Sequence, residues 1–590
     1  MIYNAPIRDM LFLLTEWIGL DRVTALPGYE EVDADLIEAV LEAAGKFCSD
    51  ELLVLNRDGD EYGAVCENGE VTTPPGFKEA YTHFIENGWT GIDSDPEHGG
   101  QGLPKLLQYF IDEMLSATNL AFKLYSELSH GVYHVLDTTA PDAIRARYLP
   151  KMVEGVWSGT MCLTEPQCGT DLGLLTTKAT PAADGHYTIS GSKIFITSGD
   201  QDLTENILHL VIARIDGAPA GTRGISLFLV PKTLVNDDGS LGRRNAVHTA
   251  SIEHKMGIRG SATCALNFDD ATGYLIGEEN KGLATMFKMM NIERLTVGMQ
   301  GLGFAEIAYQ NAYHYALDRR QSKAPAPRPD GSKPADPIIY QPEIKRQLLC
   351  IRSQVEGARA LALYAALHVD IMEKSADEEA RSEAESIVAL LTPIVKAFCT
   401  DLGLSSTLSA QQIFGGHGYI REHGMEQLVR DCRITQIYEG TNEVQALDLV
   451  SRKLTGKSGE FADRFLAGWQ TYLNEQQGDD VAAISQPAEV ALQELIEATN
   501  WIRARHESND AAVRGAATQY LRLFALTIIG CLWAQIVVSM RGKDGAFYDT
   551  KRKVARFYAQ QVLPETASLL KSICDGDDAL ADFEVTDFSD

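Results

Sequence analysis

The period of the hydrophobic pattern changes along this chain, and those changes limit the folds that it can adopt. Up to about residue 155, apolar residues recur with helical spacing, as in Lys105 to Tyr125. From about 156 to 280, short apolar runs bounded by Gly, Asp and Pro are typical of strands. These runs are Asn206 to Arg214, Gly224 to Val230 and Ala262 to Phe268. Helical spacing then returns from Lys281 to about Thr455, so the chain combines helical and β segments in the order α, β, α.

The length also requires several domains, because 590 residues are too many for one hydrophobic core. We predict a multidomain α+β protein with an N-terminal helical domain at 1–155 and a middle β-sheet domain at 156–280. A helical bundle at 281–455 and an additional C-terminal helical domain at 460–590 complete it. Gly456 to Gly459 is expected to form the linker between these last two. Ser322 to Pro337, rich in Pro, Gly and Lys, is expected to be an exposed loop.

Charge and cysteine usage exclude some classes of protein. The formal net charge of −30 argues against binding to nucleic acid or to an anionic membrane, because such proteins present clustered Lys and Arg. The ten cysteines show no CxxC or Cys/His spacing, so we expect thiols in a reducing compartment and no metal site. The first ten residues lack a signal-peptide pattern, which favours the cytoplasm.

One apolar segment tests the expectation of a soluble protein. Leu523 to Met540 contains no charged residue and is long enough to span a bilayer. Gln535 and Thr527 interrupt it, and the segments on either side are amphipathic. We therefore predict the buried central helix of the C-terminal domain rather than a membrane element.

The run Gln436 to Glu443 contains the candidate catalytic base. In it Glu439 stands between Tyr438 and Gly440, and Thr441 and Asn442 follow. A carboxylate can remove a weakly acidic C–H proton, and the glycine leaves space for a bulky ligand. Taken alone, this run could equally be a loop before a helix that starts near Asn442.

Two further segments favour a flat, phosphate-bearing ligand. Met161 to Asp171 ends a β-like run in a turn rich in hydroxyls and glycine, which can offer N–H groups to phosphate. In the strand Gly191 to Gly199, Phe195 and Thr197 are two residues apart and are expected on one face. Gln411 to Tyr419 contains consecutive glycines that would allow close approach of a ligand, but it is neither a Walker A loop nor the dinucleotide fingerprint.

Together, in this order and spacing, these segments resemble the acyl-CoA dehydrogenase family over about residues 35 to 455. The resemblance implies FAD as cofactor and an acyl-CoA thioester as substrate. Glu439 would take the α-proton while the β-hydrogen leaves as hydride to the flavin. The backbone N–H of Glu439, together with a flavin hydroxyl, would polarise the thioester carbonyl and stabilise the developing enolate.

The same resemblance assigns the cofactor contacts. Met161, Leu163 and Thr164 would lie at the flavin ring, Thr170 near the pyrophosphate, Phe195 on the isoalloxazine and Thr197 near its N5. Arg319, Gln412 and Gly416 would reach the adenine and pyrophosphate of FAD held by a neighbouring subunit, which implies a homodimer. Thr441 and Glu443 would also touch the flavin. Phe195 stands where many relatives carry Trp, and Glu443 where Gln is frequent.

A second glutamate competes for the role of base. Asn291 to Leu295 matches a helix in which some relatives carry their catalytic glutamate, here Glu293. Because the Tyr-Glu-Gly-Thr run is intact, Glu439 is preferred. Asn291 and Arg294 match positions near the CoA moiety, and Tyr438 and Gly440 are expected to contact the substrate.

The subgroup resemblance narrows the substrate but leaves alternatives. Ala5 to Leu14 and Lys255 to Ser261 resemble a bacterial subgroup with an extra C-terminal domain. This implies oxidation of 3-methylmercaptopropionyl-CoA to 3-methylthioacryloyl-CoA in dimethylsulfoniopropionate breakdown, with an electron-transfer flavoprotein as acceptor. A fatty acyl-CoA dehydrogenase or an acyl-CoA oxidase would share these motifs. A DNA-associated relative is disfavoured by the negative charge.

Overall fold

The computed structural model describes residues 1–326, 328–476, 478–576 and 580–589. The chain forms two compact units. One, called here the sheet unit, comprises Lys46–Leu103 and Thr118–Glu293. The other, the helical unit, comprises Met1–Gly45, Pro104–Ala117 and Arg294–Asp590.

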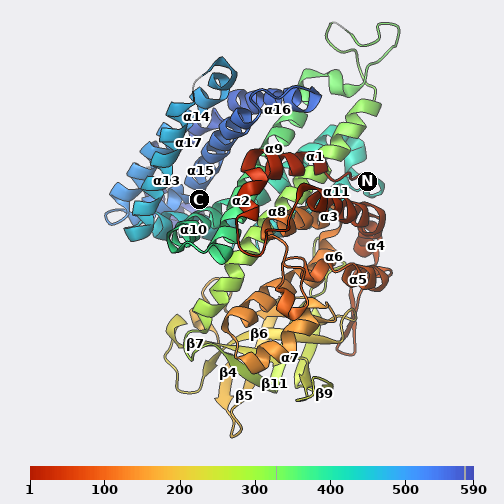
Figure 1. Cartoon of the computed structure of the whole chain (residues 1–590), viewed down its shortest axis with the longest axis vertical. Coiled ribbons are helices and arrows are strands. Elements are labelled where there is room, and N and C mark those ends of the chain that lie inside the picture. The colour runs from red at the N-terminus through yellow and green to blue at the C-terminus, as the bar shows by residue number, and fades with distance from the viewer. Residues whose placement is uncertain (327, 477, 577–579, 590) are drawn as a thin grey trace. The chain divides into compact units, whose positions relative to one another are not determined.

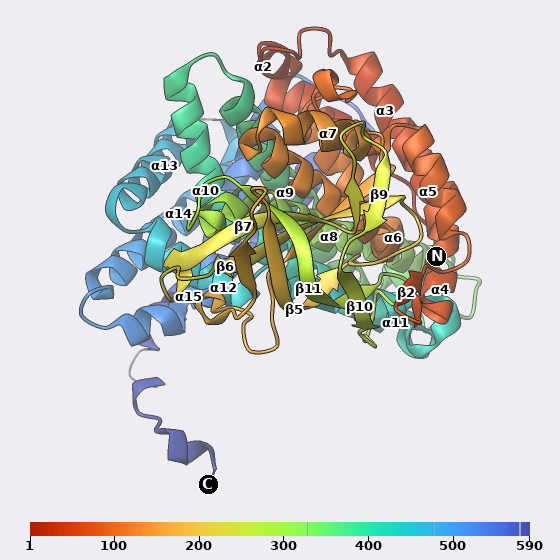
Figure 2. The same cartoon turned by 90° about the horizontal axis from the view of Figure 1, so that it is seen from below.

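The sheet unit is organised around a seven-stranded sheet with the order β10-β11-β5-β4-β6-β3, in which β7 pairs with both β11 and β6. Figure 2 shows its longer strands side by side. The parallel pairs are β3 with β6 and β4 with β6. The strands are β3 (Trp157–Cys162), β4 (Lys178–Pro181), β5 (Tyr187–Thr197), β6 (Asn206–Ile215), β7 (Ile225–Pro231), β10 (Val247–Ile252) and β11 (Thr263–Ile276). Two small hairpins pair β1 (Val65–Glu67) with β2 (Glu70–Thr72), and β8 (Thr233–Val235) with β9 (Leu241–Arg244).

The core of the sheet unit lies against β6, which is buried almost throughout. A strand covered on both faces needs apolar residues at consecutive positions, which β6 has. Its helices are α4 (Leu53–Tyr62), α5 (Phe77–Glu86), α7 (Asp142–Val153) and the later part of α6 (Lys105–Thr139). The helix α6 contains one non-helical residue, Asn119, whose side chain accepts a hydrogen bond from the Phe122 N–H at 3.0 Å.

The helical unit contains the long helices of the predicted bundle and of the additional domain. Figure 1 shows α13 to α17 grouped together in blue. Its helices are α1 (Ile7–Leu11), α2 (Leu20–Thr24), most of α3 (Ala34–Phe47), most of α8 (Gly282–Asp318), α9 (Pro342–Lys374), α10 (Glu378–Phe414), α11 (Met425–Arg433), α12 (Asn442–Asp448), α13 (Gly456–Glu475), α14 (Asp479–Arg505), α15 (Asp510–Ser539), α16 (Ala546–Phe557) and α17 (Glu565–Asp575).

The helix α15 is the buried centre of the additional domain. It packs against α9 and α10 as well as against α14 and α17. At Gly357 on α9 a Cβ atom would lie 2.5 Å from Ile529, so the glycine permits this close approach. Two helical segments, Glu378–Tyr419 and Asp510–Ser539, are long and apolar enough to cross a membrane, but 83% of each apolar window is buried within the fold.

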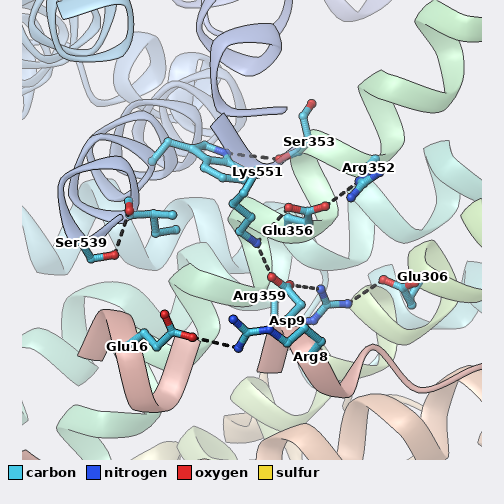
Figure 3. A network of polar contacts seen from close by, with 12 residues as sticks. Arg8, Asp9, Glu16, Glu306, Arg352, Ser353, Glu356, Arg359, Ser539 and Lys551 are labelled. Carbon is cyan, nitrogen blue, oxygen red and sulfur yellow. Dashed lines mark hydrogen bonds and ion pairs between the residues drawn. The ribbon is translucent and has the colours of Figure 1, made fainter. Parts of the chain in front are cut away.

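A buried ionic network connects the N-terminal helix α1 with α8, α9 and α16 (Figure 3). Arg359 on α9 is 2% exposed and donates to Glu113 on α6 at 2.6 Å, to Glu306 on α8 at 2.6 Å and to Asp9 on α1 at 2.8 Å. Lys551 on α16 pairs with the same Asp9 and, at 2.9 Å, with Glu356 on α9. The network therefore ties helices from both ends of the chain to the bundle.

The expected order of helical and β segments is found, and the predicted fold class is confirmed. Two details differ. The four residues Gly456 to Gly459 form the first turn of α13 rather than a linker, because the helix begins at Gly456. The apolar segment 523–540 is not a separate helix but the second half of α15. The loop expected at Ser322 to Pro337 includes Pro327, which lies outside the described residues. The acidic C-terminal segment 575–590 includes residues 577–579 and 590, which also lie outside them.

Replacing Ile536 by Asp should destabilise the additional domain. The side chain of Ile536 is fully buried on α15, so an unpaired carboxylate there would cost about 3 kcal/mol or more. Urea unfolding followed by circular dichroism should show this loss. Val490→Asp is the matched control, since Val490 on α14 is 59% exposed and should change stability by no more than about 0.5 kcal/mol. A wild-type protein that needs detergent, and that Ile536→Asp releases in active form, would instead make α15 a membrane element.

Candidate active site

In the sheet unit, the end of β3 is fixed by a buried ion pair. Lys193 on β5 donates to the Leu163 carbonyl at 2.9 Å and to the Glu165 carboxylate at 2.9 Å. Glu165 also accepts hydrogen bonds from the backbone and hydroxyl groups of Thr176 and Thr177, at 2.6 to 3.1 Å. The Thr164 carbonyl accepts from the Ile194 N–H at 2.9 Å. The backbone that presents Leu163 and Thr164 is therefore held from several directions.

The electrostatics of this pair favour its charged form. Burial alone would raise the pKa of Glu165, but the Lys193 charge and the threonine hydrogen bonds outweigh it and hold that pKa well below its usual value. Burial lowers the pKa of Lys193 in spite of the opposing charge of Glu165. Each ion is thus stabilised by the other, and loss of either would leave a buried charge.

The strand β5 contains a bulge at Phe195. Between the pairs Cys264↔Ile196 and Leu266↔Lys193, β5 has one residue more than β11. Phe195 lies there with φ of 58° and is 59% exposed, which is unusual for an aromatic residue. Because the bulge breaks the alternation of the strand, the spacing of two no longer places Phe195 and Thr197 on one face. Such strain in an exposed aromatic residue is typical of a ligand contact.

The other predicted flavin contacts of this unit lie at the ends of these two strands. Met161 and Thr197 are half-buried at the ends of β3 and β5, and Thr164 is half-buried in the residues that follow β3. Leu163 is 7% exposed, whereas Thr170 is exposed on the turn after Glu165.

In the helical unit, the predicted base lies in a strained turn. Glu439 has φ of 56° and Gly440 has φ of 83°, so two consecutive residues are left-handed. The Glu439 carbonyl accepts from Gln445 at 3.2 Å and from Arg294 at 3.4 Å. A Cβ atom on Gly440 would lie 2.8 Å from the Gln445 amide, which would have to shift, and the φ of 83° itself favours glycine at this position. The turn depends on a glycine at 440 and on donors from the helices behind it.

Lys396 on α10 is the central donor of that support. Its ammonium group donates to the Gly440 carbonyl at 2.9 Å and to the Asn442 side chain at 2.9 Å. Burial lowers the pKa of Lys396 to about 7, opposed by the nearby charges of Glu439 and Asp401. The Asn442 amide in turn donates to Asp401 at 2.7 Å. The carbonyl groups on both sides of the Glu439–Gly440 bond are thereby fixed, which sets the direction of the Glu439 side chain.

The residues flanking Glu439 are also anchored. The Tyr438 hydroxyl donates to Gln300 on α8. Thr441 is the N-cap of α12, where its hydroxyl accepts from the Val444 N–H at 3.4 Å. A hydrogen bond from Thr441 lowers the pKa of Glu443, so this carboxylate has a local partner that offsets its charge.

Along α8, the residues expected near CoA have different environments. Asn291 is exposed, whereas Arg294, one helical turn later, is 6% exposed and engaged with the Glu439 carbonyl. The rival base Glu293 is 2% exposed, and its carboxylate lies against Gly131 on α6, where a Cβ atom would come within 2.5 Å. The structure thus places Arg294 as a support of the turn.

Two of the remaining predicted contacts, Arg319 and Gly416, line a cavity of the helical unit. A cavity of about 540 Å³ is lined by Arg319 at the end of α8 and by Gly415 and Gly416 after α10. Neither glycine has any atom within 4 Å of a built Cβ, so both leave open space. Tyr315 and Phe414 stack at 4.1 Å in its wall, and the Tyr315 hydroxyl contacts His417 at 2.8 Å. Gln412 is exposed on the last turn of α10.

Sequence reasoning missed the supporting ions. Lys193 lies within a segment already singled out, and a lysine at an inward position of a strand was the available signal. No such signal identified Lys396 and Asp401, because both lie within a continuous helical pattern. Their contacts with the turn join residues that are about 40 positions apart in the sequence.

Family profiles match most of this chain. They are the acyl-CoA dehydrogenase N-terminal domain at 36–156, its middle domain at 160–271 and its C-terminal domain at 280–454. A profile described as acetyl-CoA dehydrogenase C-terminal like matches 460–584.

Known proteins agree with these profiles. The 3-methylmercaptopropionyl-CoA dehydrogenase of Ruegeria pomeroyi is 40% identical over 98% of this chain and 99% of its own length. A butyryl-CoA dehydrogenase of Syntrophomonas wolfei is 35% identical over 97% of both chains. The solved structure of an acyl-CoA dehydrogenase from Bacillus anthracis, complexed with FAD, shares the fold, with a TM-score of 0.75 and 22% identity over 96% of this chain and 92% of its own.

The fold, the family profiles and the relatives are those of a flavin-dependent acyl-CoA oxidoreductase. The chain belongs to the acyl-CoA dehydrogenase family, in the form that carries an additional C-terminal helical domain. This confirms the family expected from the sequence motifs.

Replacing Lys396 by Met should slow dehydrogenation by roughly 10- to 100-fold, because the Glu439 turn would lose its main donor and misplacement of a base by about 1 Å costs rates of this order. Stopped-flow measurement of flavin reduction at saturating acyl-CoA would give the rate. Lys105→Met is the control, since it removes another largely buried ammonium group of the helical unit, one that pairs with Glu373. A Lys396→Met enzyme that folds and reacts at the wild-type rate would show that the Glu439 turn keeps its conformation without Lys396.

Proposed function

We propose that this protein is a FAD-dependent acyl-CoA dehydrogenase in which Glu439 is the catalytic base and 3-methylmercaptopropionyl-CoA the substrate. The observation that carries this proposal is the Glu439–Gly440 turn, which presents a half-buried carboxylate in a left-handed conformation supported by Lys396, Arg294 and Gln445. Family membership gives that geometry its chemical meaning.

The reaction begins at the α-carbon of the thioester. Glu439 accepts the α-proton, and the negative charge passes to the thioester oxygen as an enolate. The backbone N–H of Glu439 is the donor that this chain offers to that oxygen, so the turn supplies both the base and part of the charge stabilisation. The donors behind the turn hold the carbonyl groups of Glu439 and Gly440.

FAD, when bound, accepts the β-hydrogen as hydride. The residues present fit this cofactor. The exposed ring of Phe195 offers a face for a flat heteroaromatic group, and the Leu163 and Thr164 backbone, which follows β3, is held by hydrogen bonds from β5. The α8–α10 cavity, with Arg319 and open glycines, has the positive charge and free backbone that an adenine dinucleotide's phosphates require.

The choice of substrate rests on similarity. The relative that matches 98% of this chain acts, by its name, on 3-methylmercaptopropionyl-CoA. A butyryl-CoA dehydrogenase also matches 97% of the chain, and a thioether chain resembles a short alkyl chain in shape. Short fatty acyl-CoA is therefore the second candidate.

The electron acceptor and the compartment complete the proposal. An electron-transfer flavoprotein would take the electrons, and the enzyme would be cytoplasmic, with no role for nucleic acid or membrane. An acyl-CoA oxidase would use the same residues but pass electrons to oxygen, so peroxide formation during turnover distinguishes it.

Glu439→Gln should keep FAD and the fold but lose more than about 100-fold of the flavin reduction rate, because an amide cannot accept the α-proton. Wild type and variant would be mixed anaerobically with a panel of acyl-CoAs that includes the 3-methylmercapto compound, which should bleach the wild-type flavin fastest. Glu293→Gln is the matched comparison. If Glu293→Gln is the inactive variant and Glu439→Gln reacts normally, the two roles are exchanged.

FAD retention should require at least a dimer. Arg319, Gln412 and Gly416 are proposed to contact FAD of the partner, so a monomer would offer an incomplete site. Light scattering with absorbance detection should show all bound flavin in dimers, and Arg319→Gln should lower flavin occupancy while leaving the protein folded. A monomer that carries full FAD would contradict the shared site.

A further inference from the structure

The additional domain contributes to a second cleft in the helical unit, and none of its lining residues is assigned to catalysis. Its volume is about 540 Å³, within the range of small-molecule sites. One wall is α13 and the others are α9, α10 and α15. The lining residues are Tyr364, Glu379, Ser382, Glu383, Ser386, Ile387, Phe461, Arg464, Phe465, Gly468, Trp469, Tyr472 and Gln535.

Aromatic rings line the α13 side of this cleft. Trp469 lies at their centre, with ring centroids 6.2 Å from Tyr364, 6.3 Å from Phe465 and 6.0 Å from Tyr472. The contacts with Phe465 and Tyr472 are edge-on. Aromatic faces are electron-rich, so a wall of this kind attracts cations as well as apolar groups.

Two carboxylates stand across the cleft. Glu379 and Glu383, one helical turn apart on α10, are exposed and form no ion pair among the residues that the structure describes. Burial raises the pKa of Tyr364 on α9 to about 12, opposed by the charge of Arg22 and assisted to a smaller extent by that of Glu383. Arg464 on α13 lies over the Phe461 ring at 5.5 Å, so this wall already accommodates one cationic group. The charged residues of the lining leave an excess of one negative charge.

Gly468 keeps the cleft open. It lies in the interior of α13, where glycine is unfavourable for a helix. No atom lies within 4 Å of a Cβ built on it, and its φ does not require glycine, so neither close packing nor backbone geometry explains the residue. Its effect is to leave empty space between Phe465 and Tyr472.

We propose that this cleft binds a small organic cation with an apolar body, of the amine or quaternary ammonium class. The electron-rich rings, the unpaired carboxylates and the missing side chain at Gly468 each favour such a ligand. The proposal does not depend on the function of Glu439, since the cleft shares no residue with the dehydrogenase site.

The test titrates the FAD-loaded protein with choline and, separately, with its uncharged isostere 3,3-dimethyl-1-butanol. Broadening of the choline N-methyl NMR signal should saturate, and choline should bind at least about 10-fold more tightly than the alcohol. Equal binding of both compounds would show that the cleft does not select for positive charge, which would contradict the proposal. Absence of choline binding would also overturn it.

Three variants assign the signal to the cleft. Gly468→Leu should fill the space and lower choline affinity at least about 10-fold while it keeps or improves the helix. The double variant Glu379→Gln and Glu383→Gln should remove the preference for choline over the alcohol. Glu385→Gln is the matched control, since it removes the same charge from an exposed position of α10 that does not line the cleft.

A variant of Arg464 tests whether the ligand of the cleft is cationic or anionic. Arg464→Gln should tighten choline binding, because a competing guanidinium group is removed. Weaker binding in this variant would indicate a ligand whose anionic group needs Arg464, contrary to the proposal. If Gly468→Leu leaves choline binding intact but changes the mass found by light scattering, the cleft is a contact between copies of the chain.

Discussion

The helical unit depends on one buried guanidinium group. Arg359 is enclosed by carboxylates from α1, α6 and α8, and Lys551 shares Asp9 with it (Figure 3). Burial alone would lower the pKa of Arg359, but these carboxylates raise it well above its usual value, so the charge is permanent. Removing any one partner would leave an uncompensated buried ion. The N-terminal segment and the additional domain are therefore held to the bundle by shared charges, not only by apolar contact.

Two of the eight described non-glycine residues with positive φ are predicted site residues. Glu439 and Phe195 are both non-glycine residues with positive φ, at a cost of about 1–3 kcal/mol each. A buried lysine donates to a backbone carbonyl in each of the two regions. Lys396 holds the Gly440 carbonyl, and Lys193 holds the Leu163 carbonyl beside β5. The two lysines lie on different elements, β5 and α10, and only the carbonyl held by Lys396 is adjacent in sequence to a strained non-glycine residue.

The sequence predicted what depends on local pattern. The periodicity located the helical and β segments, and the motifs identified Glu439, Arg319 and Gly416, the last two of which line one cavity. Sequence patterns did not predict features that depend on contacts between residues far apart in the chain. The bulge at Phe195 depends on pairing with β11, which is about 70 residues later in the chain, and periodicity within β5 cannot reveal it. The composition of Gly456 to Gly459 predicts a linker, but these residues are the first turn of α13.

The additional domain also bears on assembly. Both α10 and α15 are apolar over windows that could span a bilayer, and each buries most of its window, in part against the other. A helix such as α10, apolar on more than one face, must be covered, either by another subunit or by more of its own chain. Here α15 supplies that cover from the same chain, with Trp533 donating to the Ser353 carbonyl of α9 at 3.3 Å. The proposal of a dimer is consistent with this arrangement, since the additional domain of the same chain covers α10 and no further subunit is needed for that purpose.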